Sequence, residues 1–151
     1  MPSQFVAMPS SIGKPKPRSF ASEYNLPENF LEVEVCNPRT HGTRSMYTDY
    51  EIKLKSNIPI FKAESSVRRR YSDFEVFREM LKSDLPRVNV PQLPGKVFTN
   101  RFSPEVIKKR MEGLDKFVQH IASHPLVQNG APKLLSSFLQ DATWNKEDWL
   151  Y

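Results

Sequence analysis

Every stretch with the alternating pattern of a strand precedes every stretch with the pattern of a helix. Residues 30–35 (FLEVEV) and 46–55 alternate apolar and polar side chains, as half-buried strands do, and a third strand is predicted from about residue 65 to 71. We expect the first strand to end at residues 37–38 (Asn-Pro), so that residues 37–45 form the turn to the second. Strands followed by helices predict an α+β fold with a three-stranded antiparallel sheet, and they exclude a doubly wound nucleotide-binding fold.

The helical part, three to four helices, begins with SDFE at residues 72–75. This spacing is typical of a capping box, in which the Ser72 hydroxyl and the Glu75 carboxylate satisfy each other's backbone donors at a helix start. Similar cap and proline signals place the other boundaries. We expect the first helix to end at residues 83–86 and a second helix, capped by Ser103, to run from Pro104 to about His124. Residues 125–130 should form at most a short turn, and a last helix should begin at Pro132, with an inward face of Leu134, Leu135, Phe138 and Leu139.

Residues 88–96 (VNVPQLPGK) contain two prolines and cannot form a helix. We expect them to be an extended, polyproline-like strap across the surface. The same prolines could serve as a ligand for a proline-recognition domain. Val88, Val90 and Leu93 have the pattern of packed side chains, however, which would make the strap unavailable to a partner.

Length and composition set the class of protein. The 151 residues suffice for one domain with short tails: a disordered basic arm at residues 1–27, the domain at 28–142, and a short aromatic tail at 143–151. A net charge of +5 favours anionic partners. A single cysteine favours a reducing, cytoplasmic setting. No apolar run approaches a membrane span or a signal peptide, so we expect any membrane contact to be peripheral.

Three consecutive arginines, residues 68–70, lie where the third strand meets the first helix. Strand alternation puts Arg68 and Arg70 on one face and Val67, Arg69 and Tyr71 on the other. A solvated basic edge is the commoner explanation of such a triplet. Guanidinium groups bind phosphate oxygens bidentately, and a tyrosine ring offers a flat apolar surface, so Arg70 and Tyr71 together suit a phosphorylated ring.

Two more cations are placed unusually. Arg110 interrupts the apolar stripe of the second helix, where it either extends along the core edge to solvent or a carboxylate, or points into a pocket. Lys96 ends the rigid strap beside Gly95, although a surface lysine is by itself unremarkable in a chain this basic.

These residues form three motifs in order: RRYSDF at 69–74, VPQLPGK at 90–96, and Arg110 within a helix. The succession resembles the PX (phox-homology) domain of the sorting nexins over about residues 28–142. Residues 29–35 and 67–74 are most similar to the short, PX-only members, the sorting-nexin-three and Grd-nineteen type.

The resemblance implies a three-stranded sheet packed against a helical subdomain, with a lipid-headgroup pocket between them. It implies that Arg70 holds a 3-phosphate, Tyr71 stacks under the inositol ring, Lys96 meets the 1-phosphate, and Arg110 bonds the 4- and 5-hydroxyls. The expected ligand is phosphatidylinositol 3-phosphate, with no cofactor and no metal.

The same resemblance implies a monomeric, non-enzymatic adaptor that docks peripherally on early endosomal, prevacuolar and Golgi-derived membranes. Its expected partners are the retromer complex and transmembrane cargo. We consider the basic arm at residues 1–27 the main candidate for docking the coat.

A loop after the strap mixes apolar and basic residues at the expected pocket mouth. Val97, Phe98 and Arg101 are candidates for contact with the membrane. Phe102, beside a helix start, is expected to pack into the core. Arg69 is an auxiliary candidate that supports either the fold or the membrane surface.

Two other classes of function are less consistent with the sequence. A nucleic-acid-binding module is the alternative, supported by the arginine triplet and the basic balance, although the basic residues are scattered and no aromatic ladder recurs along a sheet face. An enzyme is disfavoured because Cys36, His41, His120 and His124 lie on separate elements without the spacing of a metal site or a catalytic nucleophile.

Overall fold

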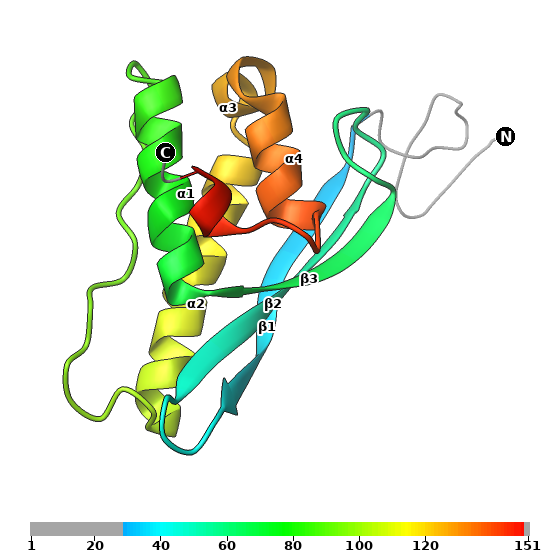
Figure 1. Cartoon of the computed structure of the whole chain (residues 1–151). Helices are drawn as coiled ribbons and strands as arrows, with labels where there is room; N and C mark the ends of the chain where they lie inside the picture. Colours follow the sequence, from blue (N-terminus) through cyan, green and yellow to red (C-terminus); the bar gives the residue numbers. More distant parts are fainter. Residues whose placement is uncertain (1–28, 150–151) are drawn as a thin grey trace, which may run out of the picture. The chain divides into compact units, whose positions relative to one another are not determined.

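A three-stranded antiparallel sheet forms one part of the fold (Figure 1). The computed structural model describes residues 29–149, so the predicted arm at residues 1–27 lies outside the described residues. The strands are β1 (Leu31–His41), β2 (Tyr47–Ser56) and β3 (Glu64–Arg70), hydrogen-bonded in the order β1-β2-β3. The helices follow in the chain, which confirms the predicted α+β fold.

The first strand is longer than the sequence predicted. β1 continues through residues 37–38 to His41, and its register with β2 shifts between Cys36 and Arg39. Asn37 takes a positive φ of 48° at this point. The residues that break strand pairing therefore form a bulge, after which pairing resumes. The predicted strand end and the turn at residues 37–45 were wrong, because the connection comprises only residues 42–46.

The helices cover one side of the sheet (Figure 1). Those predicted after Ser103 and from Pro132 are confirmed, and Ser103 accepts a hydrogen bond from the Val106 backbone N–H at 3.3 Å. The described helices are α1 (Tyr71–Asp84), α2 (Pro104–Ala122), α3 (Pro125–Gly130), α4 (Pro132–Gln140) and the 3₁₀ turn η1 (Lys146–Trp149).

The start of α1 differs from the prediction by two residues. Ser72 is not the cap: the helix begins at Tyr71, and Arg70 occupies the N-cap position with extended backbone angles. The Asp73 carboxylate accepts a hydrogen bond from the Arg70 backbone N–H at 2.7 Å, the contact that the prediction had assigned to Glu75. β3 and α1 are consequently joined without a loop, so that Arg70 ends the strand and Tyr71 starts the helix.

Residues 125–130 form a helix, α3, where at most a short turn was expected. The His124 ring nitrogen Nδ1 accepts a hydrogen bond from the Leu126 backbone N–H at 3.1 Å. Pro125 at the first helical position lacks an N–H that would otherwise need a partner. Histidine thus acts as a helix cap here, although serine, threonine, aspartate and asparagine are the usual N-cap residues.

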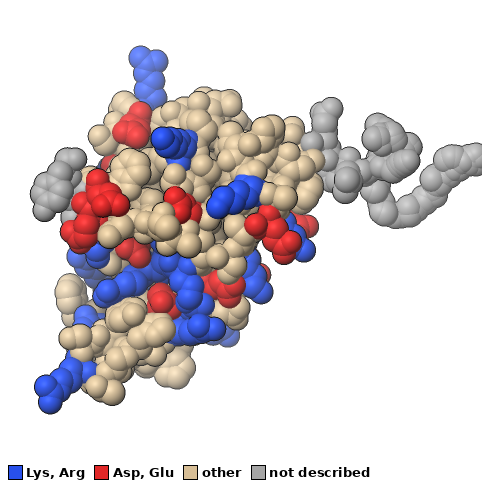
Figure 2. Space-filling view, turned by 45° about the vertical axis from the view of Figure 1, so that its right-hand side comes forward, with Lys and Arg blue, Asp and Glu red and all other residues tan. Residues whose placement is uncertain are grey.

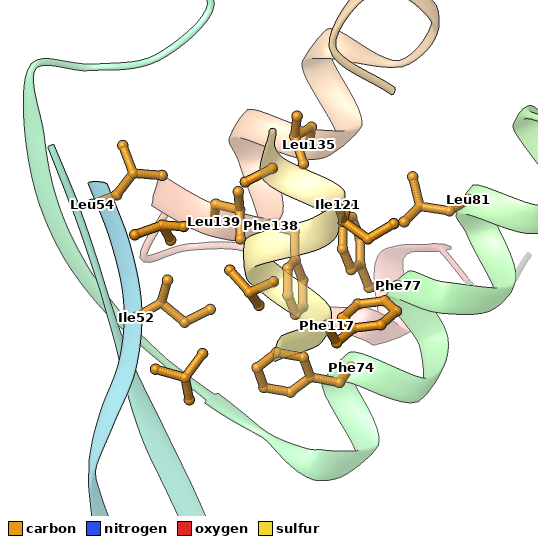
Figure 3. Close-up of a cluster of buried hydrophobic side chains, with 14 of the residues drawn as sticks. Ile52, Leu54, Phe74, Phe77, Leu81, Phe117, Ile121, Leu135, Phe138 and Leu139 are labelled. Atoms are coloured by element: carbon orange, nitrogen blue, oxygen red, sulfur yellow. The ribbon is translucent and has the colours of Figure 1, made fainter. Parts of the chain in front are cut away.

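Four phenylalanines form the centre of the core (Figure 3). Phe77 and Phe138 are stacked, with ring centroids 4.0 Å apart and an interplanar angle of 3°. Phe74 meets Phe138 edge-on at 5.1 Å, and Phe117 meets Phe77 edge-on at 6.3 Å. The inward-facing residues predicted for the last helix are buried as expected: Leu134, Leu135, Phe138 and Leu139.

The strap packs against the helices, as its apolar pattern predicted. It descends beside α1 from the end of that helix to the start of α2 (Figure 1), and Val90 is buried. The Arg78 side chain donates to the Pro91 carbonyl oxygen at 2.8 Å. On α2, Gly113 allows the close approach of Pro94, since a Cβ at this glycine would lie 2.9 Å from the proline ring.

α2 also seals the free edge of the sheet. The Asp115 carboxylate accepts from the Val35 backbone N–H at 2.9 Å, and the Gln119 amide donates to the Val33 carbonyl. These side chains replace the strand that β1 lacks on its outer side. They also fix the helix lengthwise on the sheet, which determines where Arg110 lies.

Arg69 fastens the end of β3 to the C-terminal end of α4. It is only 4% exposed, and its guanidinium donates to the carbonyl oxygens of Phe138 (3.0 Å), Ser137 (3.3 Å) and Asp141 (2.5 Å). The same group lies 5.3 Å from the ring centroids of Phe138 and Trp144. Burial lowers the pKa of Arg69 to about 10, so the side chain stays charged at neutral pH. Of the two roles considered for this auxiliary candidate, the structure shows support of the fold.

We predict that Arg69→Leu lowers the free energy of unfolding by roughly 3 kcal/mol, because buried carbonyl groups lose a charged donor. The matched control is Arg68→Leu, which removes a neighbouring arginine that is partly exposed, and we expect a loss below about 1 kcal/mol. Urea unfolding followed by circular dichroism measures both. Equal losses in the two variants would contradict the structural role of Arg69.

Candidate functional site

The three consecutive arginines lie in three different environments. Arg69 is internal, as described above, whereas Arg68 lies on the outer face of the sheet and pairs with Asp49 on β2 at 2.8 Å. Arg68 also donates to the Asn37 carbonyl at the β1 bulge. Arg70 is exposed and forms no salt bridge with a carboxylate within residues 29–149. The triplet is thus no continuous basic edge, and it offers one guanidinium for an external anion.

Arg70 is held by an aromatic ring instead of a carboxylate. Its guanidinium carbon lies 4.2 Å from the centroid of the Tyr47 ring, near the start of β2. In the backbone register of the sheet, Asp49 on β2 lies opposite Arg70 on β3. Tyr47, two residues before Asp49, is therefore the diagonal neighbour of Arg70 on the same face. A ring contact of this kind fixes the position of a cation without neutralising its charge.

Arg110 repeats this arrangement on α2. Its guanidinium carbon lies 4.0 Å from the centroid of the Tyr71 ring. The Arg110 Nε atom is buried and makes no hydrogen bond within the described part of the chain. Of the two placements considered for Arg110, the structure therefore shows the pocket: the side chain points to Tyr71 and carries an unused donor.

Tyr71 connects the strap to the helix start. Its hydroxyl donates to the Pro94 carbonyl oxygen at 2.5 Å. Burial raises the pKa of this hydroxyl, and the Glu75 carboxylate raises it further, while the Arg110 guanidinium opposes both. The hydroxyl stays protonated at neutral pH and keeps donating to the strap. Because Arg110 covers one face of the ring, Tyr71 forms a wall that positions this guanidinium.

A cavity of about 220 Å³ lies between these groups. It brings together three of the four residues predicted for the headgroup, Arg70, Tyr71 and Arg110, together with Arg101, which was a candidate for membrane contact. The full lining is Met46, Tyr47, Thr48, Tyr50, Arg70, Tyr71, Ser72, Arg101, Phe102 and Arg110. Three guanidinium groups line the cavity, those of Arg70, Arg101 and Arg110, and none of them forms a salt bridge within residues 29–149, which favours an anionic ligand.

Lys96, the fourth predicted residue, does not line this cavity. Its ammonium lies 3.5 Å from the Glu75 carboxylate, and its side chain is 63% exposed. An exposed ion pair of this kind contributes little stability, about 0–1 kcal/mol, so a phosphate can compete for the lysine. Glu75 lies one helical turn after Tyr71, so Lys96 stands near the Tyr71 side of the cavity.

The loop after the strap exposes apolar surface. Phe98 is 88% exposed, while Val97 is half-buried and Arg101 is exposed. Phe102 lines the cavity and does not belong to the core, so the expectation that it packs inside was wrong. Met46, at the turn before β2, is 37% exposed and lines the same cavity.

The loop, the β1–β2 turn and the start of α2 all lie at the lower end of the molecule in Figure 1. The face in Figure 2 shows Lys and Arg side chains gathered in its lower half, with acidic side chains more frequent above. Exposed apolar side chains and basic side chains thus share the end that carries the cavity.

Sequence reasoning missed the residues that β2 contributes, above all Tyr47. The signal is the cross-strand pairing of Asp49 with Arg70, which places Tyr47 beside the arginine. That signal requires the register of β2 with β3, which forms across the connection at residues 57–63 and is not determined by local sequence.

Within residues 29–149, no three His, Cys, Asp or Glu side chains are grouped as a metal ion would require. No helix in the same range combines the length and hydropathy needed to cross a bilayer.

Comparisons with known proteins agree with the motifs. The family model "PX domain" matches residues 60–142, more than half of the chain. "Sorting nexin-3" of Yarrowia lipolytica is 58% identical over 146 residues, which cover 94% of this chain and 95% of the relative. The chain belongs to the PX-domain sorting nexins. "Sorting nexin-3" of Schizosaccharomyces pombe is 52% identical over 119 residues, which cover 78% of this nexin and 82% of the relative.

Solved structures show the same fold as this sorting nexin. A designed CISK-PX domain superposes with a TM-score of 0.61 at 35% identity, covering 72% of this chain and 98% of that one. The mouse SNX19 PX domain superposes with a TM-score of 0.55 at 19% identity, covering 74% and 97%. The predicted PX fold is confirmed.

Family membership also supports the coarser functional interpretation. PX-domain sorting nexins are non-enzymatic, lipid-binding adaptors, and this nexin is a phosphoinositide-binding sorting adaptor that associates peripherally with membranes.

Proposed function

We propose that this sorting nexin binds the headgroup of phosphatidylinositol 3-phosphate in the cavity between β2, α1 and α2. The observation that carries the proposal is the pair Arg70 and Arg110. Both guanidinium groups border one cavity, each lies against a tyrosine ring, and neither forms a salt bridge with a carboxylate of the described chain. Charges left without a counter-ion favour the binding of an external anion.

Each predicted contact has a physical rationale. Arg70, at the N-cap of α1, is the proposed ligand of the 3-phosphate, because backbone N–H groups of the first helical turn also attract an anion there. Arg110, with its unused Nε donor, is the proposed partner of the 4- and 5-hydroxyls. Tyr71 supplies an apolar surface for the inositol ring. Lys96 would give up its ion pair with Glu75 and form one with the 1-phosphate.

Docking on the bilayer would add a second contribution of similar size. Burying Phe98 contributes on the order of 1.5–3 kcal/mol, and each Lys or Arg near an anionic leaflet contributes about 1 kcal/mol. The 88% exposure of Phe98 beside the basic Arg101 supports insertion of this loop. Headgroup binding and insertion together would direct the nexin to membranes that carry this lipid, namely early endosomal, prevacuolar and Golgi-derived membranes.

We further propose that the membrane-bound nexin cooperates with retromer to retrieve transmembrane cargo, and that it does so as a monomer. This step rests on its membership of the short sorting nexins. The arm at residues 1–27 remains the proposed docking segment for the coat.

Replacing Arg70 with alanine should weaken binding to vesicles with phosphatidylinositol 3-phosphate at least about tenfold, because a charge-assisted bond of about 1.5–3 kcal/mol is lost. The control is Arg68→Ala, which removes the same charge two residues away from a side chain already paired with Asp49. Vesicle sedimentation across all phosphoinositides, with a parallel RNA-binding assay, measures lipid preference and tests the nucleic-acid alternative. Undiminished binding by Arg70→Ala would refute the assigned site.

Phe98→Ser should weaken binding to the same vesicles roughly tenfold through lost burial, and should leave binding of a soluble, short-chain form of the lipid unchanged. Leu126→Ser is the matched control, since Leu126 is also exposed, at 59%, but lies on α3 at the upper end in Figure 1. Surface plasmon resonance on vesicles and calorimetry with the soluble lipid separate the two effects. Equal losses from both serine variants would exclude insertion by this loop.

Deleting residues 1–27 should weaken recruitment of purified retromer to vesicles while sparing the nexin's own lipid binding. A co-sedimentation assay with both proteins measures the two quantities at once. Full recruitment by the truncated nexin would assign coat docking to another segment.

A further inference from the structure

A lysine from the C-terminal segment reaches the wall of the cavity. The Lys146 ammonium, in η1, donates to the Ser72 hydroxyl oxygen at 2.8 Å across 74 positions of sequence. Ser72 is the second residue of α1 and lines the cavity together with Arg70 and Arg110. The contact therefore joins a segment that the sequence analysis had treated as a tail to the residue beside the proposed phosphate ligand.

The segment is held in place by packing. Trp144 stands edge-on to Phe138 at 5.0 Å and lies 5.3 Å from the Arg69 guanidinium, which fixes the chain two residues before Lys146. Lys146 itself is half-buried. Although Glu147 and Asp148 follow it directly, the ammonium forms no salt bridge with any carboxylate in the described range. The polar group that it contacts is the Ser72 hydroxyl oxygen.

This contact determines what the Ser72 hydroxyl can do. An ammonium group only donates, so the serine oxygen must be the acceptor in the pair. A hydroxyl has a single proton, and that proton is then left to point away from Lys146 and to donate to another acceptor. Because a bond accepted from a cation polarises the hydroxyl, the outgoing bond is strengthened. An oxygen of a singly or doubly charged phosphate group in the cavity is the acceptor that this donor fits.

We propose that Lys146 is a positioning residue of the headgroup site. It orients the Ser72 hydroxyl so that the hydroxyl donates to the phosphate bound by Arg70, and it adds a further cation near that phosphate. The inference deepens the proposed function and rests on it, since the phosphate is the one assigned there. The C-terminal segment then belongs to the lipid site as much as β3 and α1 do.

The test uses the full chain and a soluble, short-chain phosphatidylinositol 3-phosphate, measured by calorimetry. Lys146→Gln should weaken binding about three- to tenfold, and Lys146→Arg, which keeps the charge and the donors, should recover most of the affinity. Lys133→Gln removes an equal charge from an exposed position on α4 and should bind like the wild type. Melting temperatures show whether a loss of affinity comes from misfolding. If Lys146→Gln is destabilised, Lys146→Met, which keeps the packed aliphatic part of the side chain, replaces it.

A double-mutant cycle separates positioning from a general effect of charge. In a Ser72→Ala background, the Lys146 substitution should weaken binding no further. If it costs as much there as in the wild type, or if the stable Lys146 variant binds as tightly as the wild type, the positioning role is refuted. A wild-type protein that does not bind the soluble lipid would instead refute the proposed function, which is a distinct result.

Discussion

The buried guanidinium of Arg69 is the interaction on which the arrangement of the site depends. It binds carbonyl groups at the end of α4 and lies against Trp144, so it fixes the last residues of β3 to the helical part of the fold. β3 passes into α1 with no intervening loop, so a displacement of Arg69 would move Arg70 and Tyr71 with it. Burying a charged group costs free energy of desolvation, and here the hydrogen bonds from the Arg69 guanidinium to backbone carbonyl oxygens offset that cost.

Strand alternation explains why neighbouring arginines act so differently. Arg68 and Arg70 lie on one face and Arg69 on the other, as the sequence predicted from a period of two. On their common face, Arg68 lies deeper along β3 and meets Asp49, while Arg70 at the strand end meets Tyr47. Asp49 neutralises the charge of Arg68, whereas Tyr47 leaves the charge of Arg70 unneutralised. One short motif thus supplies an anchor, a paired surface charge and a candidate ligand.

Periodicity and caps predicted the parts of the fold that local sequence determines. The strands and the inward face of α4 follow from the spacing of apolar residues, and the helix after Ser103 follows from its cap and proline. The β1 bulge, the histidine cap of α3 and the Lys146–Ser72 contact depend on residues that are neighbours only in the folded chain. The same limit applies to the candidate site. Its arginines disrupt local patterns and could be found, whereas Tyr47 is ordinary in sequence and acquires its role from strand register.

The group that each cation contacts determines whether its charge is neutralised within the protein or can attract an external anion. A carboxylate would hold Arg70 and Arg110 as firmly as an aromatic ring does, but it would also cancel the field that attracts an anion. A tyrosine ring contributes on the order of 1 kcal/mol of attraction and leaves the net charge intact. Arg68 and Lys96, by contrast, lie against Asp49 and Glu75. In the proposed function, an incoming phosphate would therefore meet two guanidinium groups that rest on tyrosine rings and have no carboxylate partner within residues 29–149, and it would displace a carboxylate only at Lys96. Affinity should consequently depend most on the arginines that rest on rings.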